Sequence, residues 1–250
     1  MSKPKIYVCM TSIPPRAHQL PNVINSILNN TVKPDKIIIT LCNKYNRFDG
    51  SYNMSYLTEF KDNDIVKINF IEKDLGSVTK LIGSLDKLLT EDNIDDIYLL
   101  TADDDLPYSK NWIKNFVRRL KSEPNTVWYV FGEKQAHGVK GGIFTAFNAD
   151  GITYKLNKLH TFKNYCDLLI SDNKKWALHD DMCFSSWFKL NNIKMKKIHE
   201  KSRIYGIYPH VDKYSITKAT FPRNGVPRNN ALARSYFKLL NSGALDKFKI

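Results

Sequence analysis

Long apolar runs are missing from this 250-residue sequence. Its longest apolar stretches, such as residues 36–41 and 97–100, have the length of a β-strand, whereas a transmembrane helix needs about 20 residues. Residues 1–5 lead directly into a strand-like segment, without the apolar core or cleavage site of a signal peptide. We therefore expect a soluble, cytoplasmic protein with no transmembrane segment.

Cysteine is also scarce, with four residues in the chain. Cys9, Cys42, Cys166 and Cys183 show no C-x-x-C spacing and have no histidine at zinc-ligand spacing. A zinc site built on cysteine is therefore not expected. The sequence instead predicts buried free thiols.

Acidic residues are few in the last quarter of the chain. Residues 189–250 contain 14 Lys or Arg against 3 acidic residues, which accounts for most of the net charge of +13. Such a field attracts polyanions, namely nucleic acid, acidic lipid headgroups or nucleotide diphosphates, although a solvated lysine-rich face explains many of these residues. No nucleic-acid-binding signature is present, so no nucleic-acid partner is expected, and peripheral membrane contact through this basic region stays open.

Apolar periodicity predicts alternating strands and helices. Strands are expected at residues 5–10, 36–41, 65–71 and 97–100, and helices at residues 20–28, 78–89 and 109–120, with Ser109 as the N-cap of the last. This order predicts an α/β fold in a single domain, with a mostly parallel central sheet flanked by helices. The second half is less regular, and residues 132–151 are expected to form loops over the site.

A run of three acids follows the fourth predicted strand. Asp103, Asp104 and Asp105 repel one another at the carboxyl end of that strand, where open α/β sheets bind their ligands. A bound divalent cation offsets this repulsion, and hard carboxylate oxygens favour Mn²⁺ or Mg²⁺. The alternative is an acidic turn that caps the following helix.

Three segments carry a family resemblance. Asp103-x-Asp105 resembles the D-x-D motif of GT-A glycosyltransferases, with Tyr108 and Trp112 following as in some of these families. Residues 74–81 are similar to their D-x-G-x-x-T-K-L stretch, and residues 33–37 to their K-P-D-x-I entry into the second strand. The resemblance implies a nucleotide-diphosphate sugar donor bound by residues 1–112 and a glycan or other hydroxyl acceptor bound by residues 113–250.

A second acidic pair precedes a helix-like segment. Asp180 and Asp181 are suitable helix caps, but they also resemble the E/D-D-V motif of inverting GT-A enzymes, whose second acid is the general base. That resemblance implies that Asp181 removes the acceptor proton, with Asp180 as the fallback. Retention of configuration stays open.

The remaining candidate residues follow from the strand ends and from the resemblance. His210 is a candidate metal ligand with Asp103 and Asp105, and residues 137–142 a candidate part of the acceptor pocket. Arg223, with Arg228 as the alternative, is expected to contact the diphosphate opposite Lys80. The candidate substrate-binding residues are Thr11, Arg16, Asn43, Asp74, Lys80, Asp103, Asp104, Arg223 and Asn224.

The resemblance thus implies a metal-dependent, inverting hexosyl- or pentosyltransferase. A sugar- or nucleotide-binding module without catalysis is the first alternative, because it needs the acidic triplet but not Asp180 or Asp181. A basic nucleic-acid-binding protein is the second and less favoured alternative.

Overall fold

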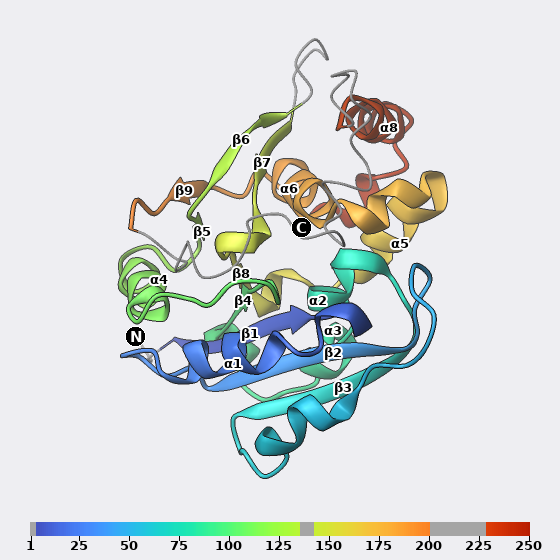
Figure 1. The fold of residues 1–250 in the computed structure, drawn as a ribbon. Helices are drawn as coiled ribbons and strands as arrows, with labels where there is room; N and C mark the ends of the chain where they lie inside the picture. Colours follow the sequence, from blue (N-terminus) through green and yellow to red (C-terminus); the bar gives the residue numbers. More distant parts are fainter. Residues whose placement is uncertain (1–3, 136–142, 201–228) are drawn as a thin grey trace.

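A five-stranded sheet forms the centre of the computed structural model, which describes residues 4–135, 143–200 and 229–250 (Figure 1). The strand order is β3-β2-β1-β4-β8, and only β8 runs antiparallel to its neighbour among these strands. This confirms the predicted mostly parallel sheet. The strands are β1 (Lys5–Thr11), β2 (Lys36–Lys44), β3 (Val66–Lys73), β4 (Ile97–Thr101) and β8 (Thr153–Lys155).

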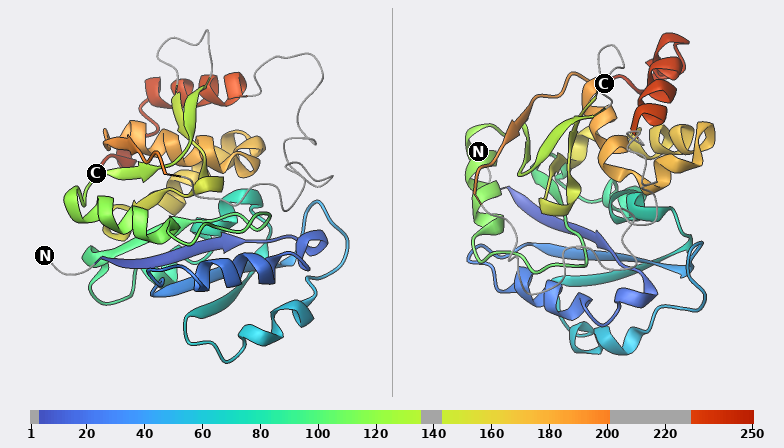
Figure 2. Two further views of the ribbon diagram at one scale, coloured as in Figure 1. Left: turned by 60° about the vertical axis from the view of Figure 1, so that its left-hand side comes forward. Right: turned by 45° about the horizontal axis from the view of Figure 1, so that its top comes forward.

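Helices cover both faces of the sheet, because alternate residues of its buried strands point to opposite sides. Ile6 and Val8 of β1 pack in one apolar cluster with α1 and α4, and Tyr7 and Cys9 pack in another with α2, α3, α5, α6 and α8. Figure 2 shows α1 on one face and α5 and α6 on the other. The helices are α1 (Leu20–Leu28), α2 (Thr79–Ile82), α3 (Leu85–Leu88), α4 (Trp112–Ser122), α5 (Phe162–Asp172), α6 (Asp180–Leu190) and α8 (Asn229–Asn241).

Two predicted helices differ from the structure. The segment 78–89 is divided into α2 and α3, because Gly83 packs against the Thr40 side chain and Ser84 Oγ hydrogen-bonds to Thr40 Oγ1 at 2.7 Å. The N-cap prediction for Ser109 is wrong. Helix α4 begins at Trp112, whose backbone N–H donates to the Ser109 carbonyl at 3.0 Å in the preceding turn.

The expectation of loops across residues 132–151 is also wrong in part. This stretch contains the antiparallel pair β6 (Gly132–Gln135) and β7 (Ile143–Ala146), because Ile, Phe and Thr at 143–145 favour an extended backbone. A further parallel pair is formed by β5 (Val127–Tyr129) and β9 (Met195–Lys197).

The prediction of buried free thiols is confirmed. Among the described residues, no helix has both the length and the apolar character needed to cross a membrane. All four cysteines are buried and free, and burial raises the pKa of the Cys9 thiol to about 12.

Candidate functional site

The acidic triplet lies just beyond the carboxyl end of β4, and its side chains alternate in exposure. Asp103 and Asp105 have side chains that are 27% and 29% exposed, whereas the Asp104 side chain is only 7% exposed. The two acids of the triplet that are predicted metal ligands, Asp103 and Asp105, are therefore the two that a ligand can reach. The middle acid faces the protein.

Asp104 joins the triplet to the loop that follows β1. Ser12 Oγ donates a hydrogen bond of 2.6 Å to Asp104 Oδ2, and Arg16 Nη1 lies 2.9 Å from Asp104 Oδ1. The same Arg16 nitrogen is 4.0 Å from Asp105 Oδ2. Arg16, a candidate substrate contact, thus lies within the site, where it neutralises part of the acidic charge.

Tyr108 and Trp112 fix the backbone of the triplet. The backbone N–H of Asp103 donates to the Tyr108 hydroxyl at 2.8 Å, and the Tyr108 and Trp112 ring centroids are 4.0 Å apart. Trp112 Nε1 in turn donates to the Asp150 carbonyl at 3.0 Å. The aromatic residues that follow the D-x-D motif therefore have a structural role.

Lys80 connects the two acidic motifs. Its Nζ forms an ion pair with Asp103 and lies 2.8 Å from Asp180 Oδ2, and its side chain is 5% exposed. Burial lowers the pKa of Lys80, but the charges of Asp103 and Asp180 and their hydrogen bonds outweigh it, so the pKa is raised overall. The D-x-D motif and the second acidic pair thus meet around one cation.

The loop from Asp74 to α2 places Lys80 there. Asp74 Oδ1 accepts a hydrogen bond of 2.7 Å from the Gly76 backbone N–H, and Gly76 has a φ of +66°. A Cβ atom at Gly76 would collide with the carbonyl of Ala177, which lies just before α6. This glycine therefore allows the Lys80 segment to approach the segment that carries Asp180 and Asp181.

Asp181 has a different environment from Asp180. Its Oδ1 accepts hydrogen bonds from the Asn148 backbone N–H at 2.6 Å and from Asn148 Nδ2 at 3.0 Å. Burial, followed by the charge of Asp180, raises the pKa of Asp181 to about 8, while the Asn148 backbone bond and the Lys80 charge oppose this rise. The pair begins α6, as predicted.

Asn148 is a site residue that the sequence did not indicate. Its Oδ1 accepts hydrogen bonds from the Tyr154 hydroxyl at 2.7 Å and from Thr101 Oγ1 at 3.0 Å, so its side chain is fixed from two strands. It lies 33 residues before Asp181 in the chain. No local pattern marks such a contact.

Arg47 and Tyr52, from the polar segment after β2, were also missed. Burial and the nearby Arg16 charge lower the pKa of Arg47, whereas Asp74 and Asp104 raise it. Among the described residues, Arg47 Nε and the Tyr52 hydroxyl are buried without a hydrogen-bond partner. The only sign of these two residues in the sequence was that a polar segment directly follows a predicted parallel strand.

Three predicted substrate-binding residues make contacts within the protein at the same edge of the sheet. Thr11 Oγ1 donates to the Thr40 carbonyl at 2.7 Å, and Asn43 Nδ2 donates to Glu72 Oε1 at 2.7 Å. Asp74 accepts from the Asn46 backbone at 3.1 Å as well as from Gly76. The predictions that lie outside the described residues are His210, Arg223, Asn224, Arg228 and residues 137–142.

The donor set suits a hard cation. Within the described part of the chain, no group of three His, Cys, Asp or Glu residues is arranged to hold a metal ion. Mg²⁺ and related ions, however, commonly bind through one or two carboxylates plus water and substrate phosphates. The partly exposed Asp103 and Asp105 fit that pattern.

Comparison with known proteins shows the fold. No family model and no curated protein matches the sequence. The structure is similar to the crystal structure of S. aureus TarS 1-349 in complex with UDP, with a TM-score of 0.51 and 14% identity. For TarS 1-349 alone the TM-score is 0.50 and the identity 13%. TarS is a GT-A-type glycosyltransferase. The chain has the GT-A fold.

The extent of this similarity is partial. Both alignments cover 80% of this chain and 59% of the TarS chain, so the chain spans less than two thirds of the length of the protein it matches. At this identity, the comparison establishes the fold, and the chemistry has to be argued from the side chains.

Proposed function

We propose that this protein is a metal-dependent glycosyltransferase that moves a sugar from a nucleotide-diphosphate donor to an acceptor hydroxyl with inversion. The observation that carries the proposal is the pair of contacts made by Lys80, which brings Asp103 and Asp180 together at the ligand-binding edge of a GT-A sheet. An isolated helix cap at Asp180 and Asp181 would not require this arrangement.

The donor diphosphate is assigned to the acidic triplet and the guanidinium groups beside it. Asp103 and Asp105 would hold Mn²⁺ or Mg²⁺, with His210 as the proposed third ligand. When bound, the ion supplies positive charge to the leaving diphosphate. Arg16 and Arg47 add cationic charge on the same side, and the predicted contacts of Lys80 and Arg223 with the diphosphate remain part of the proposal. UDP is the first nucleotide to test, because the similar TarS structure contains it.

Asp181 is the proposed general base. Its Oδ1 is held by Asn148, while no hydrogen bond to its Oδ2 is found among the described residues, which leaves one carboxylate oxygen to accept a proton. In the transfer, the acceptor oxygen attacks the anomeric carbon and its proton passes to Asp181. The bond from that carbon to the diphosphate oxygen breaks, and the nucleoside diphosphate leaves. Asp180, which is paired with Lys80, remains the fallback base.

The first experiment is a thermal-shift panel of sugar nucleotides with and without Mn²⁺. A ligand that binds only the folded state raises the melting temperature by mass action, so we expect one class of donor to stabilise the protein in the presence of the ion. Candidate hydroxyl acceptors are then added to the stabilising donor, and released nucleoside diphosphate is measured. Donor binding without any release would favour the binding-module alternative.

A further inference from the structure

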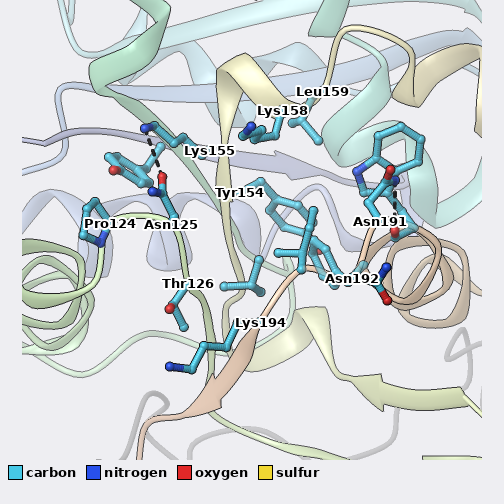
Figure 3. Close-up of a pocket in the computed structure, with 15 residues that line it drawn as sticks. Pro124, Asn125, Thr126, Tyr154, Lys155, Lys158, Leu159, Asn191, Asn192 and Lys194 are labelled. Atoms are coloured by element: carbon cyan, nitrogen blue, oxygen red, sulfur yellow. Dashed lines mark hydrogen bonds between the residues drawn. The ribbon is translucent and has the colours of Figure 1, made fainter. Parts of the chain in front are cut away.

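A separate cavity of about 280 Å³ lies at the other end of the central sheet. Tyr98 and Tyr154 contribute to its wall from β4 and β8, and Phe188 from the C-terminal part of α6. Figure 3 shows Tyr154 between Lys155 and Lys158 on one side and Lys194 on the other.

This cavity is distinct from the acidic site. Tyr98 precedes Asp103 by five residues along an extended segment, which separates the two by roughly 16 Å at the usual rise per residue. Along α6, Trp187 follows Asp181 by six residues, or roughly 9 Å. A ligand in the cavity would therefore not occupy the donor or acceptor position.

The charged residues that line the cavity are all basic. Lys155, Lys158 and Lys194 line it, and none of its described lining residues is acidic. Lys194 Nζ lies 3.2 Å from Oε2 of Glu123, a residue that does not line the cavity. Lys155 Nζ donates a hydrogen bond of 3.3 Å to Asn125 Oδ1. Lys158 is exposed and makes no hydrogen bond or ion pair within the described part of the chain. The opening therefore favours an anion.

The walls favour a flat apolar body. Tyr98, Tyr154, Trp187 and Phe188 provide aromatic surface. The Trp187 side chain is fully buried, and its indole Nε1 is closed to a ligand in the cavity, so the wall offers the ring and not a hydrogen-bond donor.

We infer that this cavity binds a small aromatic monoanion, such as an aromatic carboxylate, with the ring between the aromatic walls and the anionic group near Lys158 and Lys194. The volume has room for roughly ten non-hydrogen atoms, if each takes the space of a water molecule. The inference does not rest on the proposed transferase activity, because Lys158 and Lys194 lie outside the acidic site, although the Tyr154 hydroxyl reaches Asn148 of that site.

The test is a protein-observed NMR titration of the full chain with benzoate, its neutral analogue benzamide, and acetate. We expect benzoate to bind at millimolar concentration, more tightly than either of the others, and to shift the Trp187 indole N–H resonance. Equal binding of benzoate and benzamide, or no benzoate binding at millimolar concentration, would overturn the inference.

A pair of double variants locates the binding. Lys158→Gln/Lys194→Gln should weaken benzoate binding by roughly tenfold, because it removes two partly exposed charges beside the ligand. The matched control is Lys61→Gln/Lys67→Gln, which removes two exposed lysines near β3 at the opposite edge of the sheet and should leave binding unchanged. Equal losses in both variants would show only a general charge effect and would contradict the assignment.

Discussion

Asp180 and Asp181 are adjacent residues of the same type with different surroundings. Asp180 is paired with Lys80, whereas Asp181 is held by two hydrogen bonds from Asn148 and has a raised pKa. A carboxylate that is less stable as an anion is a stronger base once it is ionised, so the environment favours Asp181 over Asp180 for proton removal at a pH of about 8 or above. The residue types alone did not distinguish them beyond the family resemblance.

Replacement of Asp181 by Asn should lower the transfer rate by roughly 10²–10⁴-fold and leave donor affinity nearly unchanged. The reason is that the base acts on the acceptor proton in the transition state and has little contact with the donor. Steady-state kinetics and donor calorimetry on Asp181→Asn and Asp180→Asn check this. Full activity in both variants would mean that the base lies elsewhere or that the reaction proceeds with retention.

The raised pKa of Asp181 also predicts a dependence of stability on pH. An unfolded Asp ionises near pH 4, whereas the folded Asp181 has a pKa of about 8. Between these values the unfolded state loses its proton and the folded state keeps it, so this group lowers the free energy of unfolding as pH rises from about 4 to 8. In Asp181→Asn this decline should be smaller, as measured by urea unfolding across that range. An identical slope in both proteins would contradict the assigned pKa.

At the scale of elements, the sequence was sufficient where periodicity is strong. Helix α1 has the predicted bounds of residues 20–28, and the four predicted strands of the parallel part are all present. It was insufficient where a tertiary contact decides the local structure, as at Gly83 and Ser84, which pack on Thr40 and interrupt a predicted helix. The acidic motifs were visible as local runs, but the Asn148–Asp181 contact joins distant segments.

The junction between the Lys80 loop and α6 makes a prediction at this scale. Gly76→Ala should destabilise the protein for two reasons. The added Cβ would collide with the Ala177 carbonyl, and the positive φ at this position alone costs a residue other than glycine about 1–2 kcal/mol. Gly50→Ala is the matched control, since Gly50 has a φ of +86° with open space around its Cβ position. Urea unfolding should show the larger loss for Gly76→Ala. Equal losses would mean that the contact with Ala177 does not constrain the loop.

At the scale of the whole molecule, two regions with different chemistry lie at opposite ends of the central sheet. The acidic site lies beyond the carboxyl end of β4, and the lysine-lined cavity includes Tyr98 near its amino end. The mostly parallel sheet and the position of the candidate site at its carboxyl edge were predictable from the alternation of strands and helices, whereas the GT-A fold was implied by the family resemblance. The cavity was not predictable, because its walls come from four separated segments of the chain, at residues 98, 124–127, 154–159 and 187–194.

The most direct test of the central claim is calorimetric titration of UDP with Mn²⁺ into the wild-type protein, Asp105→Asn and the control Lys67→Gln. Asp105 is partly exposed beside the proposed diphosphate position, and Lys67 is exposed on β3. We predict Mn²⁺-dependent UDP binding in the wild-type protein and in Lys67→Gln, and loss of that binding in a folded Asp105→Asn. Unchanged Mn²⁺-dependent affinity in Asp105→Asn would contradict the account.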